Sequence, residues 1–311
     1  DFYIQNGENV TNVFLDSNMV RTNQLYLNNN LIKSIDIPTG LTNVTYLGLS
    51  NNKVSGITIG EDLRSLQQIN LENNQLSGFT VKSGWTSLTY TFLGGNYISS
   101  INIPTGMINY TYIGLSNNLL TGFTDFYGLN YIQNLILTSN LITEPIPIWF
   151  SGLTHLQNLN LGSNLMSGSI PDVFGSMSNL YNLQLYYNLF TSGLTSLSGL
   201  TGLTSLNISQ NNFSGSTIFN LTGFRNLTNV NFSYCNLSGE VILCSATTYP
   251  NGYSFAYNYF TGNIPALNEN QGSNYYVSFN DNQFTGYTSM VGSSNDLVSG
   301  NFSNNYLSTT E

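Results

Sequence analysis

The feature that most constrains this chain is an asparagine that returns at a fixed interval. Up to residue 140 it recurs every 22 residues, and beyond that point the step lengthens to 23 or 24. The thirteen positions are Asn30, Asn52, Asn74, Asn96, Asn118, Asn140, Asn164, Asn188, Asn211, Cys235, Asn258, Asn282 and Asn305. A period of this size predicts an array of short units that stack on one another and share one continuous core.

Each unit carries the pattern L-x-L-x-x-N-x-L, as in the stretch from Leu47 to Val54. Alternation of apolar and polar residues predicts a short strand with one buried face. Asparagine has both a carbonyl acceptor and an amide donor. We therefore expect an inward asparagine at the strand exit to bond the backbones of its own turn and of the next turn, where tight bends would otherwise bury unpaired polar groups.

A second signature follows the asparagine in eight units: an apolar residue, then Ser or Thr, then Gly, as in Leu76-Ser77-Gly78. Two units continue it to Ile-Pro, at Gly168–Pro171 and Gly262–Pro265. These motifs resemble the leucine-rich repeat over nearly the whole chain, and the L-[ST]-G-x-I-P ending resembles its plant-type extracellular subclass. The 22-residue units of the first half are shorter than is usual for that subclass.

The resemblance implies an α/β solenoid of the leucine-rich repeat type. Such a chain is a curved right-handed superhelix with a parallel β-sheet on its concave face, irregular, 3-10 or short β segments on its convex face, and little α-helix. Residues 25–311 would form one solenoid of about 13 repeats.

Residues 1–24 are irregular, because Val13–Asn18 imitates a strand unit although Asn18 precedes Asn30 by only 12 residues. Either Tyr3–Asn6 begins a true unit and the imitation lies on the far side, or residues 1–24 form a small cap.

Charge is scarce. Charged residues make up 7% of the chain, the net charge is -9, and Lys and Arg together number six. Because phosphate binding needs clustered cations, a nucleic-acid or anionic-membrane partner is not expected. No apolar run is long enough to span a membrane, and no charged start with an apolar core marks a signal peptide. A surface made soluble by Asn, Ser, Thr and Tyr favours a secreted or cell-surface protein, and a start at Asp1 suits either a processed product or a fragment.

N-glycosylation sequons of the form N-x-[ST] number ten. About ten would also arise by chance in so Asn- and Ser/Thr-rich a chain, so their register is more informative than their number. Several hold outward positions in the middle of predicted strands, and we expect covalent N-glycans if the chain passes through a eukaryotic secretory route. The sequons are Asn9, Asn43, Asn109, Asn207, Asn212, Asn220, Asn226, Asn231, Asn236 and Asn301.

The strand face of the first half offers a column of candidate binding residues: Tyr46, Gln68, Tyr90, Phe92 and Tyr112. Exposed aromatic rings stack on sugars or anchor a protein partner. Ordinary aromatic packing between neighbouring strands is the other interpretation. Gly48 and Gly114 leave space beside the rings.

The two cysteines, Cys235 and Cys244, lie nine residues apart within one unit. They form either a local disulfide in an oxidising compartment or one buried ladder thiol plus one loop thiol.

The sequence predicts neither catalysis nor a cofactor nor a metal site. Its one histidine, His155, has no nearby cysteine, serine–aspartate pair or metal-ligand spacing.

Two functional hypotheses remain. In the first, the favoured one, the chain is a glycosylated extracellular scaffold that stacks head to tail on itself into a filament or surface layer. Both ends of the sequence lack the paired-cysteine caps of the plant-type subclass, and an uncovered strand edge and open core favour pairing. The alternative is an extracellular recognition domain that binds a protein, peptide or polysaccharide through its concave face.

Overall fold

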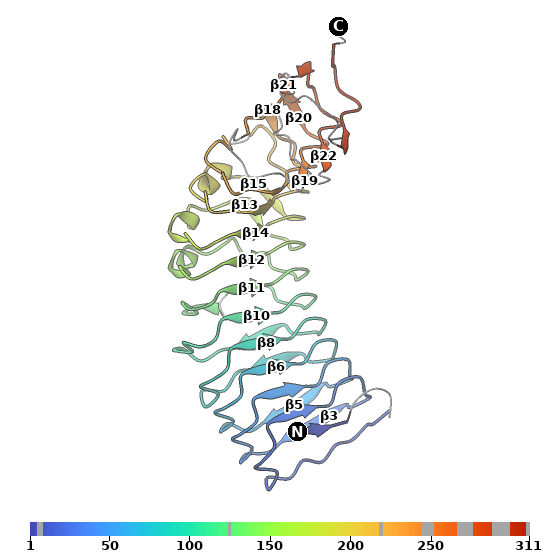
Figure 1. The fold of residues 1–311 in the computed structure, drawn as a ribbon, viewed down its shortest axis with the longest axis vertical. Coiled ribbons are helices and arrows are strands. Elements are labelled where there is room, and N and C mark those ends of the chain that lie inside the picture. The colour runs from blue at the N-terminus through green and yellow to red at the C-terminus, as the bar shows by residue number, and fades with distance from the viewer. Residues whose placement is uncertain are drawn as a thin grey trace. The chain divides into compact units, whose positions relative to one another are not determined.

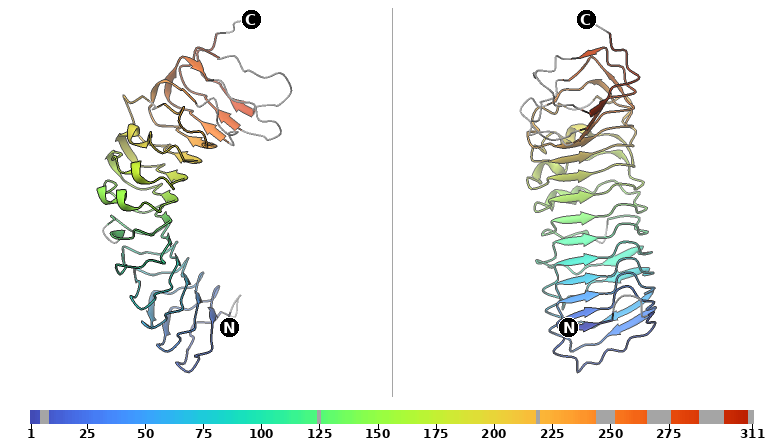
Figure 2. Two further views of the ribbon diagram at one scale, coloured as in Figure 1. Left: turned by 60° about the vertical axis from the view of Figure 1, so that its left-hand side comes forward. Right: turned by 45° about the vertical axis from the view of Figure 1, so that its right-hand side comes forward.

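The computed structural model describes residues 1–4, 9–123, 126–217, 220–243, 252–265, 276–287 and 299–308. The chain divides into two compact units, Asp1–Ile142 and Thr143–Glu311. Each unit is a β-solenoid in which every turn contributes one strand to a parallel sheet (Figures 1 and 2). Among the described residues the helices that can be delimited are three short 3-10 turns, η2 (Ile148–Gly152), η3 (Phe174–Ser176) and η4 (Leu194–Leu197). The expected solenoid with little α-helix is therefore confirmed.

In the first unit, seven strands form the sheet in chain order: β1 (Phe2–Tyr3), β2 (Gln24–Tyr26), β4 (Tyr46–Gly48), β6 (Gln68–Asn70), β8 (Tyr90–Phe92), β10 (Tyr112–Gly114) and β11 (Asn134–Ile136). Register follows the sequence period, because residues 22 apart pair directly from β2 to β11. The central residue of each complete strand, such as Leu47, is buried, so its two neighbours point outward.

Residues 1–24 contribute a strand to this sheet. Phe2 pairs with Leu25 and Tyr3 with Tyr26. Residues 12–15 lie away from the sheet and line a cavity together with the strand Ser34–Ile37.

In the second unit, the sheet strands are β12 (Asn158–Asn160), β14 (Asn182–Gln184), β16 (Ser205–Asn207), β17 (Asn229–Asn231), β19 (Gly252–Ser254), β22 (Tyr276–Ser278) and β24 (Ser299–Asn301). The step between paired residues is 23 or 24 here, as the sequence period requires.

Shorter sheets of two strands lie on the outer side of the turns. In the first unit β3 (Ser34–Ile37) pairs with β5 (Gly56–Ile59) and β7 (Gly78–Thr80) with β9 (Ser100–Asn102). In the second unit the pairs are β13 (Ser167–Ser169) with β15 (Leu189–Ser192), β18 (Ser238–Glu240) with β20 (Tyr259–Thr261), and β21 (Asn263–Ile264) with β23 (Gly286–Tyr287).

The recurring asparagine forms a buried ladder through the core. Asn74 Nδ2 donates to Leu71 O of its own turn at 3.0 Å and to Leu49 O of the preceding turn at 2.9 Å. Its Oδ1 accepts from Val54 N, also of the preceding turn, at 2.9 Å. The prediction that the side chain would bond the next turn was therefore wrong. It bonds the backbone of the preceding turn, because the loop that follows each strand lies against the loop of that earlier turn.

The residue immediately before each ladder position adopts a left-handed backbone conformation. Its φ lies between 50° and 67° in every turn from Asn29 to Asn304. Asparagine and glycine tolerate this region, and the first unit uses mainly these two residues there. The second unit places bulky side chains at this costly position, at Tyr187, Tyr234 and Tyr257. The rings of Tyr234 and Tyr257 stack at 4.1 Å.

Candidate functional site

The outward side chains of the first unit's sheet, here called the aromatic face, begin with three tyrosines in ring contact. Tyr3 and Tyr26 are parallel with ring centroids 4.7 Å apart, and Tyr26 and Tyr46 follow at 4.9 Å. Tyr3 and Tyr26 are in register on adjacent strands. The ring of Tyr46 reaches Tyr26 because it lies over Gly48, the residue in register with Tyr26. These rings form one half of the candidate site.

A second aromatic group lies two strands further along. Phe92 and Tyr112 have ring centroids 4.8 Å apart, and Tyr90 and Tyr112 6.2 Å apart. Tyr90 remains 42% exposed. The polar side chains of β6, Gln68 among them, separate the two groups. Packing between strands therefore accounts for the ring contacts, and it leaves ring surface open to a ligand.

Two glycines explain how the rings lie. A Cβ at Gly48 would meet Cε1 of Tyr46 at 2.7 Å, and a Cβ at Gly114 would meet Cε1 of Tyr112 at 3.1 Å. Each tyrosine ring therefore lies flat over the glycine two residues later in its own strand. The space that the glycines were expected to leave beside the rings is filled by the rings themselves.

One carboxylate acts on this face. Burial raises the pKa of Tyr46 and of Tyr112, and the negative charge of Glu72 raises both pKa values further. A hydrogen bond with Asn28 lowers the pKa of Tyr46 in part. Glu72 therefore gives the aromatic face a local negative potential between its two aromatic groups.

The second unit presents amide and hydroxyl groups on its sheet. Asn182 Nδ2 donates to Asn158 Oδ1 at 2.7 Å, and Gln184 Nε2 to Asn182 Oδ1 at 2.6 Å. A shallow cavity of about 270 Å³ lies over Gly252, between Asn231 and Tyr276. This surface is polar where the aromatic face is not.

The sequon asparagines differ in what their side chains do. Asn207, Asn231 and Asn301 are the last residues of their strands rather than the middle ones, and each Oδ1 accepts from the backbone two residues later. Asn43 Nδ2 donates to Val20 O and Asn109 Nδ2 to Thr86 O, so a glycan there would replace a hydrogen bond. Asn9, Asn212, Asn220, Asn226 and Asn236 are exposed. Their glycosylation stays a prediction.

Cys235 occupies the ladder position once and is buried, with Sγ 3.2 Å from Ile208 O. If residue 235 were asparagine, its Oδ1 would accept a hydrogen bond from Phe213 N. With cysteine there, Phe213 N donates instead to Cys235 O at 2.9 Å. Cys244 lies outside the described residues, so its pairing with Cys235 stays a prediction.

We expect Cys235 to resist alkylation while the protein is folded. Burial raises its thiol pKa to about 12, so the reactive thiolate is scarce at mildly alkaline pH. Because folding raises the pKa of this thiol, its protonated form contributes to the free energy of unfolding. That contribution is fully present below the unfolded pKa of roughly 8.5 and is lost as the pH rises toward about 12. Iodoacetamide labelling followed by peptide mass spectrometry, with and without urea, measures this. Fast labelling of the folded protein would contradict it, and a mass lower by two hydrogens would establish the disulfide.

In the part of the chain that the structure describes, no group of three or more His, Cys, Asp or Glu is placed to hold a metal ion. His155 is exposed at the end of a turn. Within the same residues, no helix has the length and apolarity that a membrane span requires.

Three family profiles match the sequence. The BspA type leucine rich repeat region matches residues 2–121, the leucine rich repeat matches residues 131–190, and a further leucine rich repeat profile matches residues 202–224. Together they cover about two thirds of the chain. No curated protein matches the sequence.

Solved structures share the fold at low sequence identity. The plant peptide hormone receptor RGFR1, in complex with RGF2, is similar with a TM-score of 0.66 and 23% identity over 87% of this chain and 49% of that one. A leucine-rich repeat protein of Leptospira interrogans has a TM-score of 0.65 and 21% identity over 89% and 72%. The ectodomain of the Arabidopsis thaliana receptor kinase GASSHO1/SCHENGEN3, in complex with CASPARIAN STRIP INTEGRITY FACTOR 2, has a TM-score of 0.54 and 21% identity over 91% and 44%.

The chain thus spans about half the length of the RGFR1 chain that it matches. Its thirteen-fold ladder, the parallel sheet that the ladder supports, the three family matches and these neighbours agree. This chain is a leucine-rich repeat protein.

Proposed function

We propose that this chain is an extracellular recognition domain and that it binds a peptide, or a peptide segment of a protein, through its aromatic face. The observation that carries the proposal is the pair of aromatic groups around Tyr46 and Tyr112, laid flat on Gly48 and Gly114. Amphipathic aromatic side chains dominate the energetics of binding interfaces. Two of the similar structures, those of RGFR1 and GASSHO1/SCHENGEN3, are complexes of plant receptors with RGF2 and with CASPARIAN STRIP INTEGRITY FACTOR 2.

The geometry describes the ligand. β4 and β8 are two strand spacings apart, about 10 Å. A peptide in the polyproline II conformation rises about 3.1 Å per residue and turns every third side chain to the same face. Apolar residues three positions apart would therefore reach both aromatic groups. Between them Glu72 would attract a lysine or arginine of the ligand.

The experiment is selection from a displayed library of random dodecapeptides, followed by calorimetry of the selected peptides. We expect enrichment of apolar residues three apart with a basic residue between them. The double variant Tyr46→Ala, Tyr112→Ala should bind the selected peptides more than tenfold more weakly, because it removes one ring from each aromatic group.

Tyr97→Ala is the matched control. Tyr97 is 57% exposed in the same unit but follows the ladder position, away from the aromatic face. Its variant should bind as the parent does. Equal binding by the parent and the double variant would sink the proposal.

Head-to-tail stacking, the hypothesis favoured by the sequence, stays a prediction, and the neighbours support recognition better. The stacking and recognition hypotheses predict different results in a sedimentation-velocity experiment. Recognition expects a monomer at micromolar concentration, whereas growing assemblies that persist in the double tyrosine variant would support the filament.

A further inference from the structure

One step in the outer strands of the first unit is left unpaired. Where two outer strands pair, a backbone hydrogen bond joins the residues just before them. Ser55 N donates to Lys33 O ahead of β3 and β5, and Ser99 N donates to Ser77 O ahead of β7 and β9, each at 3.0 Å. Within residues 9–123, all of which the structure describes, no such bond joins Ser77 to Ser55. Accordingly β5 pairs only with β3, and β7 only with β9.

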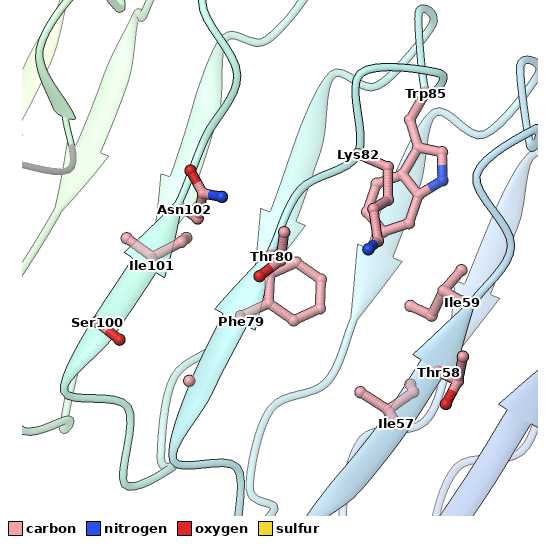
Figure 3. A pocket seen from close by; sticks show the side chains of 11 residues that line it. Ile57, Thr58, Ile59, Phe79, Thr80, Lys82, Trp85, Ser100, Ile101 and Asn102 are labelled. Atoms are coloured by element: carbon pink, nitrogen blue, oxygen red, sulfur yellow. The ribbon is translucent and has the colours of Figure 1, made fainter.

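Two aromatic side chains explain the interruption. Phe79 stands where the neighbouring turns carry Ile57 and Ile101, and Trp85 stands where the preceding turn carries Leu63. Both rings are buried, with centroids 6.3 Å apart. Because one turn holds two larger side chains on its outer side, its outer strand cannot approach the previous one as closely. Figure 3 shows both rings between the two strands.

The result is a slot that is closed at each end. Gln75 N donates to Val54 O at 2.9 Å where the strands begin, and Trp85 Nε1 donates to Gly60 O at 2.8 Å where they end. A cavity of about 460 Å³ lies here, and its lining extends from β5 across β7 to residues 100–102 of β9. That volume is within the range of pockets that bind small ligands.

The β5 side of the slot offers unused backbone groups. Gly60 N donates to Ile37 O of β3. Since successive residues of a strand turn their N–H and C=O to opposite sides, those of Ile57 and Ile59 face the slot.

The β7 side of the slot also offers unused backbone groups. Val81 N donates to Asn102 O of β9, so the N–H and C=O groups of Gly78 and Thr80 face the slot. Neither edge has a partner strand. Free strand edges of this kind pair with an extended peptide.

The charge of the lining indicates which end of the peptide would bind. Lys82 stands two residues beyond the end of β7 and lies beside Trp85 (Figure 3). The lining contains this one ammonium group and no carboxylate. A peptide parallel to β7 would bring its C-terminus to Lys82, because β7 also ends there.

We propose that the slot between β5 and β7 binds the carboxyl-terminal residues of an extended peptide. The peptide backbone pairs with the free edge of β7, the terminal carboxylate contacts Lys82, and the last side chain, an apolar one, lies against Phe79 and Ile59 of the lining. Roughly three residues span β7 at about 3.3 Å each. This site is separate from the aromatic face.

The test uses N-acetylated tetrapeptides ending in isoleucine or phenylalanine, each as the free acid and as the C-terminal amide, titrated into the whole chain by calorimetry. The acid should bind at least about tenfold more tightly than the amide, because only the acid forms a charge-assisted bond. Lys82→Met should abolish that difference. Lys53→Met, which changes an exposed lysine of the same unit outside the slot, should leave it intact.

Equal binding of acid and amide, or an unchanged preference in Lys82→Met, would overturn the proposal, as would no binding at millimolar peptide. If 3-phenylpropionate bound as tightly as the tetrapeptide, strand pairing would be wrong. The double variant Tyr46→Ala, Tyr112→Ala should bind the tetrapeptide normally, so this result and that for the aromatic face can fail independently.

Discussion

Replacing Asn118 with alanine should lower the free energy of unfolding by about 2–5 kcal/mol. The side chain is 5% exposed and accepts from Ile98 N at 2.9 Å. Its Nδ2 donates to Leu93 O at 3.0 Å and Leu115 O at 3.1 Å. Both carbonyls keep a second ladder asparagine, so the main cost is a buried Ile98 N–H without an acceptor, added to two lost bonds and a small cavity.

Urea unfolding followed by circular dichroism would measure the change. Asn102→Ala is the control, since Asn102 is exposed on β9 and should alter stability by no more than about 0.5 kcal/mol. Similar losses for the two variants would mean that the ladder contributes no more than any surface asparagine.

The second large effect is expected at Gly193, which precedes η4. Its φ is 87°, and a Cβ there would meet Ile170 O at 2.2 Å and Ile170 N at 2.6 Å. Gly193→Ala therefore adds a left-handed penalty of roughly 1–2 kcal/mol to a collision with backbone that no side-chain rotation relieves. We expect a total loss of about 3 kcal/mol or more, visible as a lower melting temperature.

Gly175→Ala, in η3 of the same unit, isolates the cause. A Cβ at Gly175 meets nothing within 4 Å and its φ is not positive. That variant should be neutral or slightly stabilising, because alanine restricts the unfolded chain. A loss at Gly175 equal to that at Gly193 would contradict the geometric explanation.

The strands and the ladder could be predicted because they follow from the period. A repeat of fixed length forces residues such as Leu47 and Ile69 into register, and alternation decides which of them is buried. The direction of the ladder could not be predicted, because Asn74 has the same spacing to the turn before it as to the turn after it. Only the path of the loop decides which backbone it reaches.

The aromatic column was visible in the sequence, whereas the position of its rings was not, since the ring of Tyr46 could have pointed away from Gly48. The slot between β5 and β7 was missed, although a signal existed: Phe79 and Trp85 are larger than Ile57 and Leu63 one period earlier. Comparing side-chain volumes at equivalent positions, rather than only their polarity, would have shown where two turns are held apart.

The direction of the ladder has a consequence for how the protein is made. Ile32 N, Val54 N and Leu76 N each bond the asparagine of the turn after them, at 2.9 or 3.0 Å. On the ribosome, a newly synthesised turn therefore holds a buried donor without an acceptor until about 20 further residues emerge. The turns should therefore fold in order from the N-terminus, each one only after the next turn has been synthesised. In a nascent chain paused at any length, the most recent turn should remain partly unfolded.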